Sequence, residues 1–148
     1  MDMQLPQDFK EFLRLLNSHE VEYLLIGGYA VGYHGHPRAT NDLDIWIATS
    51  PDNARRLVGV LKQFRFDLPE LNESLFLVPD SIVRMGIPPM RIELLTSVSG
   101  IEFAPSYAKR VVVDLAGVRT NLISLDFLKL NKQAAGRFKN LDDLEHLP

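Results

Sequence analysis

Hydrophobic and polar positions follow two different periods along this chain, which predicts a mixture of helices and strands. Between Gln7 and Ser18 apolar residues recur every three to four positions, the spacing of an amphipathic helix. Ser50-Pro51-Asp52 is a helix start signal ahead of a second such stretch. The same spacing predicts helices over 53–64 and 124–135, short helices over 29–34 and 141–147, and a short helix or turn over 101–108.

Short runs rich in β-branched and aromatic residues predict the strands. One run, 21–26, ends at a glycine pair, and another, DLDIWIA, covers 42–48. Further strands are predicted over 75–78, 82–85, 90–95, 111–115 and 119–123, with turn signals at Pro79-Asp80 and 87–89, a hairpin turn at Ala116-Gly117 and a connector over 66–71. Strands that alternate with helices predict an α/β (α+β) fold, a mixed sheet flanked by helices. We expect one domain over 1–148, with C-terminal helices from about residue 124.

Composition narrows the function classes. The 148 residues are 46% hydrophobic and 24% charged, as in one soluble globular domain. A net charge of −3 argues against a nucleic-acid coat or a basic membrane-surface module, although it leaves room for a local basic patch. The chain has no cysteine, which excludes disulfides, thiolate zinc, iron–sulfur clusters and cysteine nucleophiles. Without a basic and then apolar leader or a long apolar window, we expect a cytoplasmic protein with no membrane association.

Two carboxylates stand at the start of one predicted strand. Asp42 and Asp44 are two residues apart, so both side chains face the same way, while Leu43 and Ile45 face the other way. Two such anions repel each other unless a hard divalent cation lies between them. The pair therefore predicts a Mg²⁺ site, with two exposed strand-end residues as the alternative.

Gly27-Gly28 closes the strand upstream of the aspartates. Glycines at a strand-to-helix turn let a phosphate approach the backbone N–H groups of the helix. An ordinary turn is the alternative, because paired glycines are common at turns.

Together, Gly27-Gly28 and Asp42-Leu43-Asp44 resemble the signature of the polymerase-beta-like nucleotidyltransferase superfamily. The stretch GGYAVGYHGHPRATNDLDIWI is more closely similar to small prokaryotic nucleotidyltransferase-like proteins, including those of abortive-infection and toxin–antitoxin systems. Those relatives often carry a His-Gly, an Arg and a Thr before the aspartates, matched here by His34-Gly35, Arg38 and Thr40.

The resemblance also implies a third carboxylate from a later strand, and Glu93 in MRIELLTSV matches it best, where the family more often has Asp. On that strand Ile92 and Leu94 would face the core, while Arg91 and Glu93 face the site. The alternative for Glu93 is a strand-face carboxylate paired with Arg91. Three other acidic residues, Glu70, Glu73 and Asp80, lie in predicted connectors.

Near the C-terminus, the resemblance matches a Lys, an Arg and an Asp of the toxin-linked relatives with Lys132, Arg137 and either Asp142 or Asp143. Lys132 and Arg137 could contact nucleotide phosphates, and the alternative is a solvated basic helix end. The basic cluster of the sequence is Lys129, Lys132, Arg137 and Lys139, where a phosphate-rich partner would dock.

Three further side chains have two interpretations each. His34 and His36 could be metal ligands or acid–base groups, but histidines beside a turn are more often structural or exposed. Trp46 falls on the same strand face as the two aspartates, where it could stack on a base or pack in the core.

The resemblance implies transfer of a nucleoside monophosphate from an NTP to a hydroxyl of RNA (such as tRNA), protein or a small molecule. Asp42, Asp44 and Glu93 would hold two Mg²⁺ ions, or Mn²⁺, and Gly27, Gly28, Arg38, Thr40, Lys132 and Arg137 would bind the nucleotide. The first alternative is a catalytically silent binding module, such as one component of a toxin–antitoxin pair. A two-metal phosphohydrolase fits less well because such sites usually draw on several histidines. The small size predicts a homo-oligomer or a partner protein that completes substrate recognition.

Overall fold

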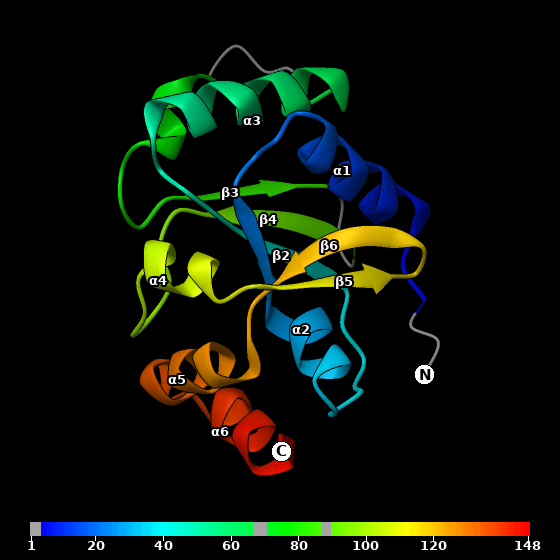
Figure 1. Ribbon diagram of the computed structural model, residues 1–148, viewed down its shortest axis with the longest axis vertical. Coiled ribbons are helices and arrows are strands. Elements are labelled where there is room, and N and C mark those ends of the chain that lie inside the picture. The colour runs from blue at the N-terminus through cyan, green and yellow to red at the C-terminus, as the bar shows by residue number, and fades with distance from the viewer. Residues whose placement is uncertain (1–3, 67–70, 87–89) are drawn as a thin grey trace.

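A six-stranded mixed sheet forms the centre of the molecule and helices cover both of its faces (Figure 1). The computed structural model describes residues 4–66, 71–86 and 90–148. Helices α1 (Gln7–Ser18) and α3 (Pro51–Gln63) lie on one side of the sheet. On the other side lie α2 (Gly27–Tyr33), α4 (Phe103–Ala108), α5 (Leu125–Ala135) and α6 (Phe138–His146). The predicted fold class is confirmed.

The strand order is β3-β4-β2-β1-β6-β5. Strand β1 runs antiparallel to β2 and parallel to β6, and β2 runs parallel to β4, which makes the sheet mixed. The outer pairs β3–β4 and β5–β6 are antiparallel. The bounds are β1 Tyr23–Ile26, β2 Asp42–Ile47, β3 Ile82–Met85, β4 Arg91–Leu95, β5 Val111–Leu115 and β6 Val118–Leu122.

Local signals explain where the elements begin and end. The Ser50 side chain accepts a hydrogen bond from the Asn53 N–H and Pro51 occupies the first turn of α3, so the predicted start signal is confirmed. Ser124 caps α5 in the same way. Both Ala116 and Gly117 have positive φ, as a two-residue hairpin turn requires, and the predicted β5–β6 hairpin is confirmed.

The strand residues that face the helices are buried, and together with the helix residues they form one connected core. Phe12, Leu13 and Leu16 of α1 and Leu57 of α3 are completely buried. All four residues of β1 are also buried, because this central strand is covered on both faces. None of the helices in the described ranges is long and apolar enough to cross a membrane.

The predicted strand over 75–78 is wrong. Residues Glu73–Phe76 form a short 3₁₀ helix, η1, whose start is capped by the Asn72 side chain accepting from the Ser74 N–H. Phe76, one of the apolar residues that suggested a strand, is buried and fixes this turn to the core. The predicted turn at 87–89 and most of the connector over 66–71, with Glu70, lie outside the described residues.

Candidate functional site

The two predicted aspartates and the predicted glutamate come from neighbouring parallel strands. Asp42 and Asp44 lie at the start of β2, and Glu93 lies on β4. In the β2–β4 register Asp44 is the direct partner of Glu93, and Asp42 is the partner of Arg91. Side chains of direct partners emerge on the same face of a sheet. The fold therefore gathers three carboxylates at one end of two adjacent strands.

Burial and mutual repulsion act most strongly on Asp44. Burial, then Glu93, then Asp42 raise the pKa of Asp44 from 3.8 to about 6, and the positive charges of Lys132 and Lys139 offset part of that rise. The two lysines come from α5 and α6, so the C-terminal helices face this carboxylate. Asp44 thus lies at a point of excess negative charge, which a bound cation would relieve.

Two arginines form ion pairs with Asp42 and Glu93. Arg91 lies 3.6 Å from Asp42 and 3.8 Å from Glu93, and Arg84 lies 3.2 Å from Glu93. The Arg91 Nε is buried without a hydrogen bond, so its ion pair with Asp42 is poorly aligned. The ligand oxygens of Asp42, Asp44 and Glu93 do not all lie within 4.8 Å of one another, so binding one common ion requires side-chain rotation.

Each of the two predicted glycines faces a site residue. Gly27 has φ +72°, and a Cβ built there would lie 2.1 Å from the Asp44 Oδ2. A Cβ at Gly28 would lie 2.5 Å from the Thr40 Oγ1. The absence of side chains at these two positions therefore makes room for Asp44 and Thr40. The residue pattern alone did not predict this role of the glycines.

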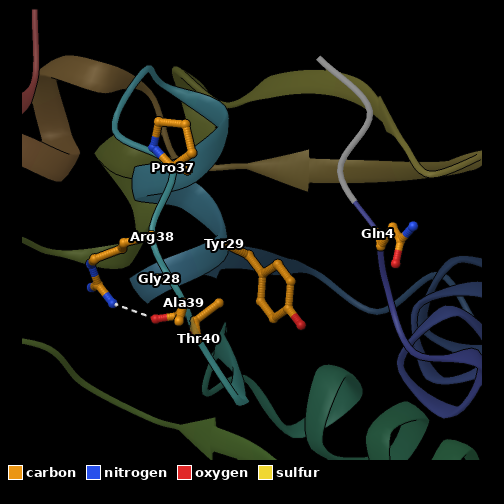
Figure 2. A pocket seen from close by; sticks show the side chains of 8 residues that line it. Gln4, Gly28, Tyr29, Pro37, Arg38, Ala39 and Thr40 are labelled. Atoms are coloured by element: carbon orange, nitrogen blue, oxygen red, sulfur yellow. Dashed lines mark hydrogen bonds between the residues drawn. The ribbon is translucent and has the colours of Figure 1, made fainter.

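A pocket of about 300 Å³ brings together three of the predicted nucleotide-binding residues, Gly28, Arg38 and Thr40. Figure 2 shows the ring of Tyr29 on one side of the backbone that carries Arg38, Ala39 and Thr40, whereas the Arg38 side chain extends to the opposite side. The Arg38 guanidinium also donates to the Ala39 carbonyl (Figure 2). The volume is at the lower end for a small-molecule site.

Arg38 and Lys132 are brought together by a buried aspartate. Arg38 Nε and Nη2 donate to the two oxygens of Asp143 at 2.8 and 3.0 Å, and the Lys132 Nζ lies 3.1 Å from Asp143 Oδ2. Burial alone would raise the pKa of Asp143, but these hydrogen bonds hold it below its usual value. Both predicted phosphate-binding cations are therefore bound to the same carboxylate. A nucleotide would have to compete with Asp143 for them.

The remaining basic residues of the predicted cluster are more exposed. Arg137 precedes α6 as its N-cap residue and Lys139 lies in the first turn, both exposed. Lys129 bonds the carbonyl of Pro148. Between the two exposed cations stands Phe138, which is 90% exposed. Lys132 is buried and does not contribute to the basic surface.

Trp46 and His34, two of the side chains with two interpretations, make structural contacts. Trp46 is buried and packs edge-to-face on Phe103, with ring centroids 5.2 Å apart. The His34 Nε2 is 2.7 Å from the carbonyl of Ile123, which ties α2 to the end of β6. Sequence reasoning missed Arg84, which reaches Glu93 only because β3 pairs with β4. The one signal in the sequence that could have indicated Arg84 is the alternation of side-chain direction along β3.

Comparisons with known proteins place the fold. No model of a known protein family and no curated protein matches the chain. A provisionally assigned nucleotidyltransferase of Thermotoga maritima has a similar structure, with a TM-score of 0.63 and 15% identity over 93% of this chain and 88% of that one. An antigenic nucleotidyltransferase-like protein of Paracoccidioides brasiliensis gives a TM-score of 0.56 and 20% identity over 96% and 76%. The chain therefore has the fold of these nucleotidyltransferase-type structures.

Proposed function

We propose that this protein is a divalent-metal-dependent nucleotidyltransferase, which moves a nucleoside monophosphate from an NTP to a hydroxyl acceptor. The observation that carries the proposal is the register of Asp44 with Glu93, with Asp42 two residues before. The similarity to two nucleotidyltransferase-type structures supports the same class.

The residues present fit a pair of Mg²⁺ or Mn²⁺ ions. Oxygen ligands suit these hard cations. Burial first, and then the negative charges of Glu93 and Asp42, raise the pKa of Asp44, and a bound cation would favour its ionised carboxylate. The poorly aligned Arg91 is easily displaced from Asp42. When bound, the ions would neutralise the triphosphate and lower the pKa of the attacking hydroxyl.

The chain's own residues supply binding and orientation. Asp42, Asp44 and Glu93 hold the metal ions, and the contact with Gly27 fixes where the Asp44 carboxylate lies. Lys139 and the exposed Arg137 present positive charge to the phosphates from the α6 side. Gly28, Thr40 and Arg38 border the pocket beside the start of α2, where the nucleotide binds.

The test measures thermal stabilisation by ATP, CTP, GTP and UTP with Mg²⁺. The wild type should be stabilised by at least one nucleotide, and Asp44→Asn should lose the effect. Asp52→Asn, at an exposed position of α3, should keep it. Transfer of label from an α-labelled NTP to RNA, protein or a small molecule in cell extract then identifies the acceptor. A chain that binds no nucleotide and transfers no label is the silent binding module instead.

A further inference from the structure

Two histidines and an aspartate from distant parts of the chain meet beside the buried Asp143. His36 lies between α2 and β2, and Asp142 and His146 lie on α6. One ligand atom of each lies within 4.8 Å of the other two, a closeness that no other group of three His, Asp or Glu reaches in 4–66, 71–86 and 90–148. We propose that His36, Asp142 and His146 form a second metal site, which binds a transition-metal ion such as Zn²⁺.

Helix geometry and ring stacking bring the three side chains close together. Asp142 and His146 are four residues apart on α6, so they share one face of the helix. The His36 ring stacks on the His146 ring, with centroids 4.3 Å apart and planes 13° from parallel. Because the lone pairs of the imidazole nitrogens lie in the ring planes, one ring must rotate out of the stack to direct one nitrogen of each ring at a common ion.

The partner of His146 fixes which nitrogen is free. The His146 Nδ1 is 2.8 Å from the carbonyl of Asp142, and in the neutral ring it donates its hydrogen there. That leaves the Nε2 lone pair for a metal. A ligating histidine typically donates its other N–H to a carbonyl or carboxylate in this way, which sets its tautomer.

The donor set separates this site from the acidic one. Two imidazoles and one carboxylate suit Zn²⁺, Co²⁺ or Ni²⁺, whereas Mg²⁺ prefers oxygen ligands alone. The side chains of Asp142 and His146 are half exposed, so solvent has access for the ion and for a water as fourth ligand. The His36 side chain is 20% exposed, and its Nε2 lies 4.0 Å from the Asp143 Oδ1.

A bound ion would join two elements that already meet at Asp143. His36 and Arg38 belong to the segment that leads into β2, and Asp142 and Asp143 are neighbours on α6. The Arg38–Asp143 ion pair joins these elements from inside, and the metal would join them from outside. Zn²⁺ should therefore stabilise the docking of α6 on this segment and raise the melting temperature.

The experiment titrates Zn²⁺ into the full-length, chelator-treated protein by calorimetry, with saturating Mg²⁺ to occupy the acidic site. The wild type should bind one equivalent and melt at a higher temperature. His36→Ala and His146→Ala should each weaken binding by about tenfold or more. His19→Ala, on the far side of the sheet, should bind as the wild type does. Asp44→Asn should also retain this site, which separates the present proposal from the proposed function.

A second readout uses Co²⁺, whose visible absorption reports nitrogen and carboxylate ligands directly. The spectrum should appear with the wild type and disappear with the double variant His36→Ala/His146→Ala. Asp142→Asn keeps the size of the side chain and provides a variant that folds if an alanine variant does not. Equal Zn²⁺ binding by the wild type and the double variant, or no binding by the folded wild type, would overturn the proposal.

Discussion

The carboxylate of Asp44 occupies the space that a side chain at position 27 would need. A Cβ on Gly27 would lie 2.1 Å from its Oδ2 and 2.9 Å from its Cγ. Gly27 follows β1 directly and opens α2, and its neighbour Ile26 pairs with Asp44 across the β1–β2 ladder. The turn between β1 and α2 is thus built around the Asp44 carboxylate of the candidate site.

This contact predicts that Gly27→Ala damages the site more than the fold. The substitution meets Asp44 and also forces a non-glycine residue to φ +72°. We expect a loss of about 1–3 kcal/mol in the free energy of unfolding. Because Asp44 must move, we also expect Mg²⁺-dependent nucleotide binding to be lost. Chemical denaturation and thermal shift with NTP measure the two effects.

Gly117→Ala is the matched control. Gly117 also has positive φ, but a Cβ there would meet nothing within 4 Å, so this variant bears the backbone strain without the contact. Adding Asp44→Ala to Gly27→Ala should restore part of the stability, since it removes the clashing group. If Gly27→Ala and Gly117→Ala cost the same, and Asp44→Ala gives no recovery, the contact is not the cause.

The raised pKa of Asp44 predicts how metal-free stability depends on pH. In the native state the pKa of Asp44 is about 6, against about 3.9 in an unfolded chain. The native state therefore binds the proton more tightly, and the stability this gives is complete below about pH 4 and is lost as the pH rises through about 6. The loss should be about 3 kcal/mol.

Asp44→Asn should remove this dependence. In chelator the variant should be more stable than the wild type at about pH 8, by about 3 kcal/mol, and nearly equal to it at about pH 4. Urea denaturation at both pH values measures the difference. Asp52→Asn, on an exposed pair, should follow the wild type at both. A wild type whose stability rises with pH through this window would contradict the assignment.

Much of the fold was predictable because its signals are local. The amphipathic period of α1, the cap at Ser50 and the hairpin turn at Ala116-Gly117 each depend on a few consecutive residues. The mistaken strand over 75–78 shows the limit. Its apolar residues did not reveal that Asn72 starts a tight turn, or that Phe76 is the one fully buried residue of the segment.

The site was harder to predict because its contacts join distant parts of the chain. Alternation along β2 was enough to put Asp42 and Asp44 on one face, but strand order decides that Glu93 is the partner of Asp44. No local pattern reveals that Asp143 bonds both Arg38 and Lys132, since these residues come from a loop and two helices. The position of the cations therefore required the structure.

The buried Asp143 predicts a stability effect in the C-terminal helices. It is 1% exposed and neutralises Arg38 and Lys132. Asp143→Asn leaves both cations without their anion, and we expect it to lower the free energy of unfolding by about 3 kcal/mol. Thermal melting and hydrogen exchange of α5 and α6 measure the effect.

Glu145→Gln is the control for that substitution, because it removes one negative charge from an exposed position of α6. It should change stability by less than about 0.5 kcal/mol. Equal effects of the two variants would mean that the charge of α6 matters and the contacts of Asp143 do not.

Arg91 predicts a reciprocal effect of metal. Because Arg91 partly neutralises Asp42 and Glu93, Arg91→Met should lower metal-free stability at neutral pH by about 1 kcal/mol while it keeps the apolar stem. Saturating Mg²⁺ should restore that stability, since the ion takes over the neutralisation, so the variant should gain more from Mg²⁺ than the wild type does. Arg55→Met removes an exposed ion pair on α3 and should gain no more than the wild type. Thermal melting with and without Mg²⁺ separates the cases, and an equal Mg²⁺ response in all three proteins would mean that Arg91 and the ion do not share the carboxylates.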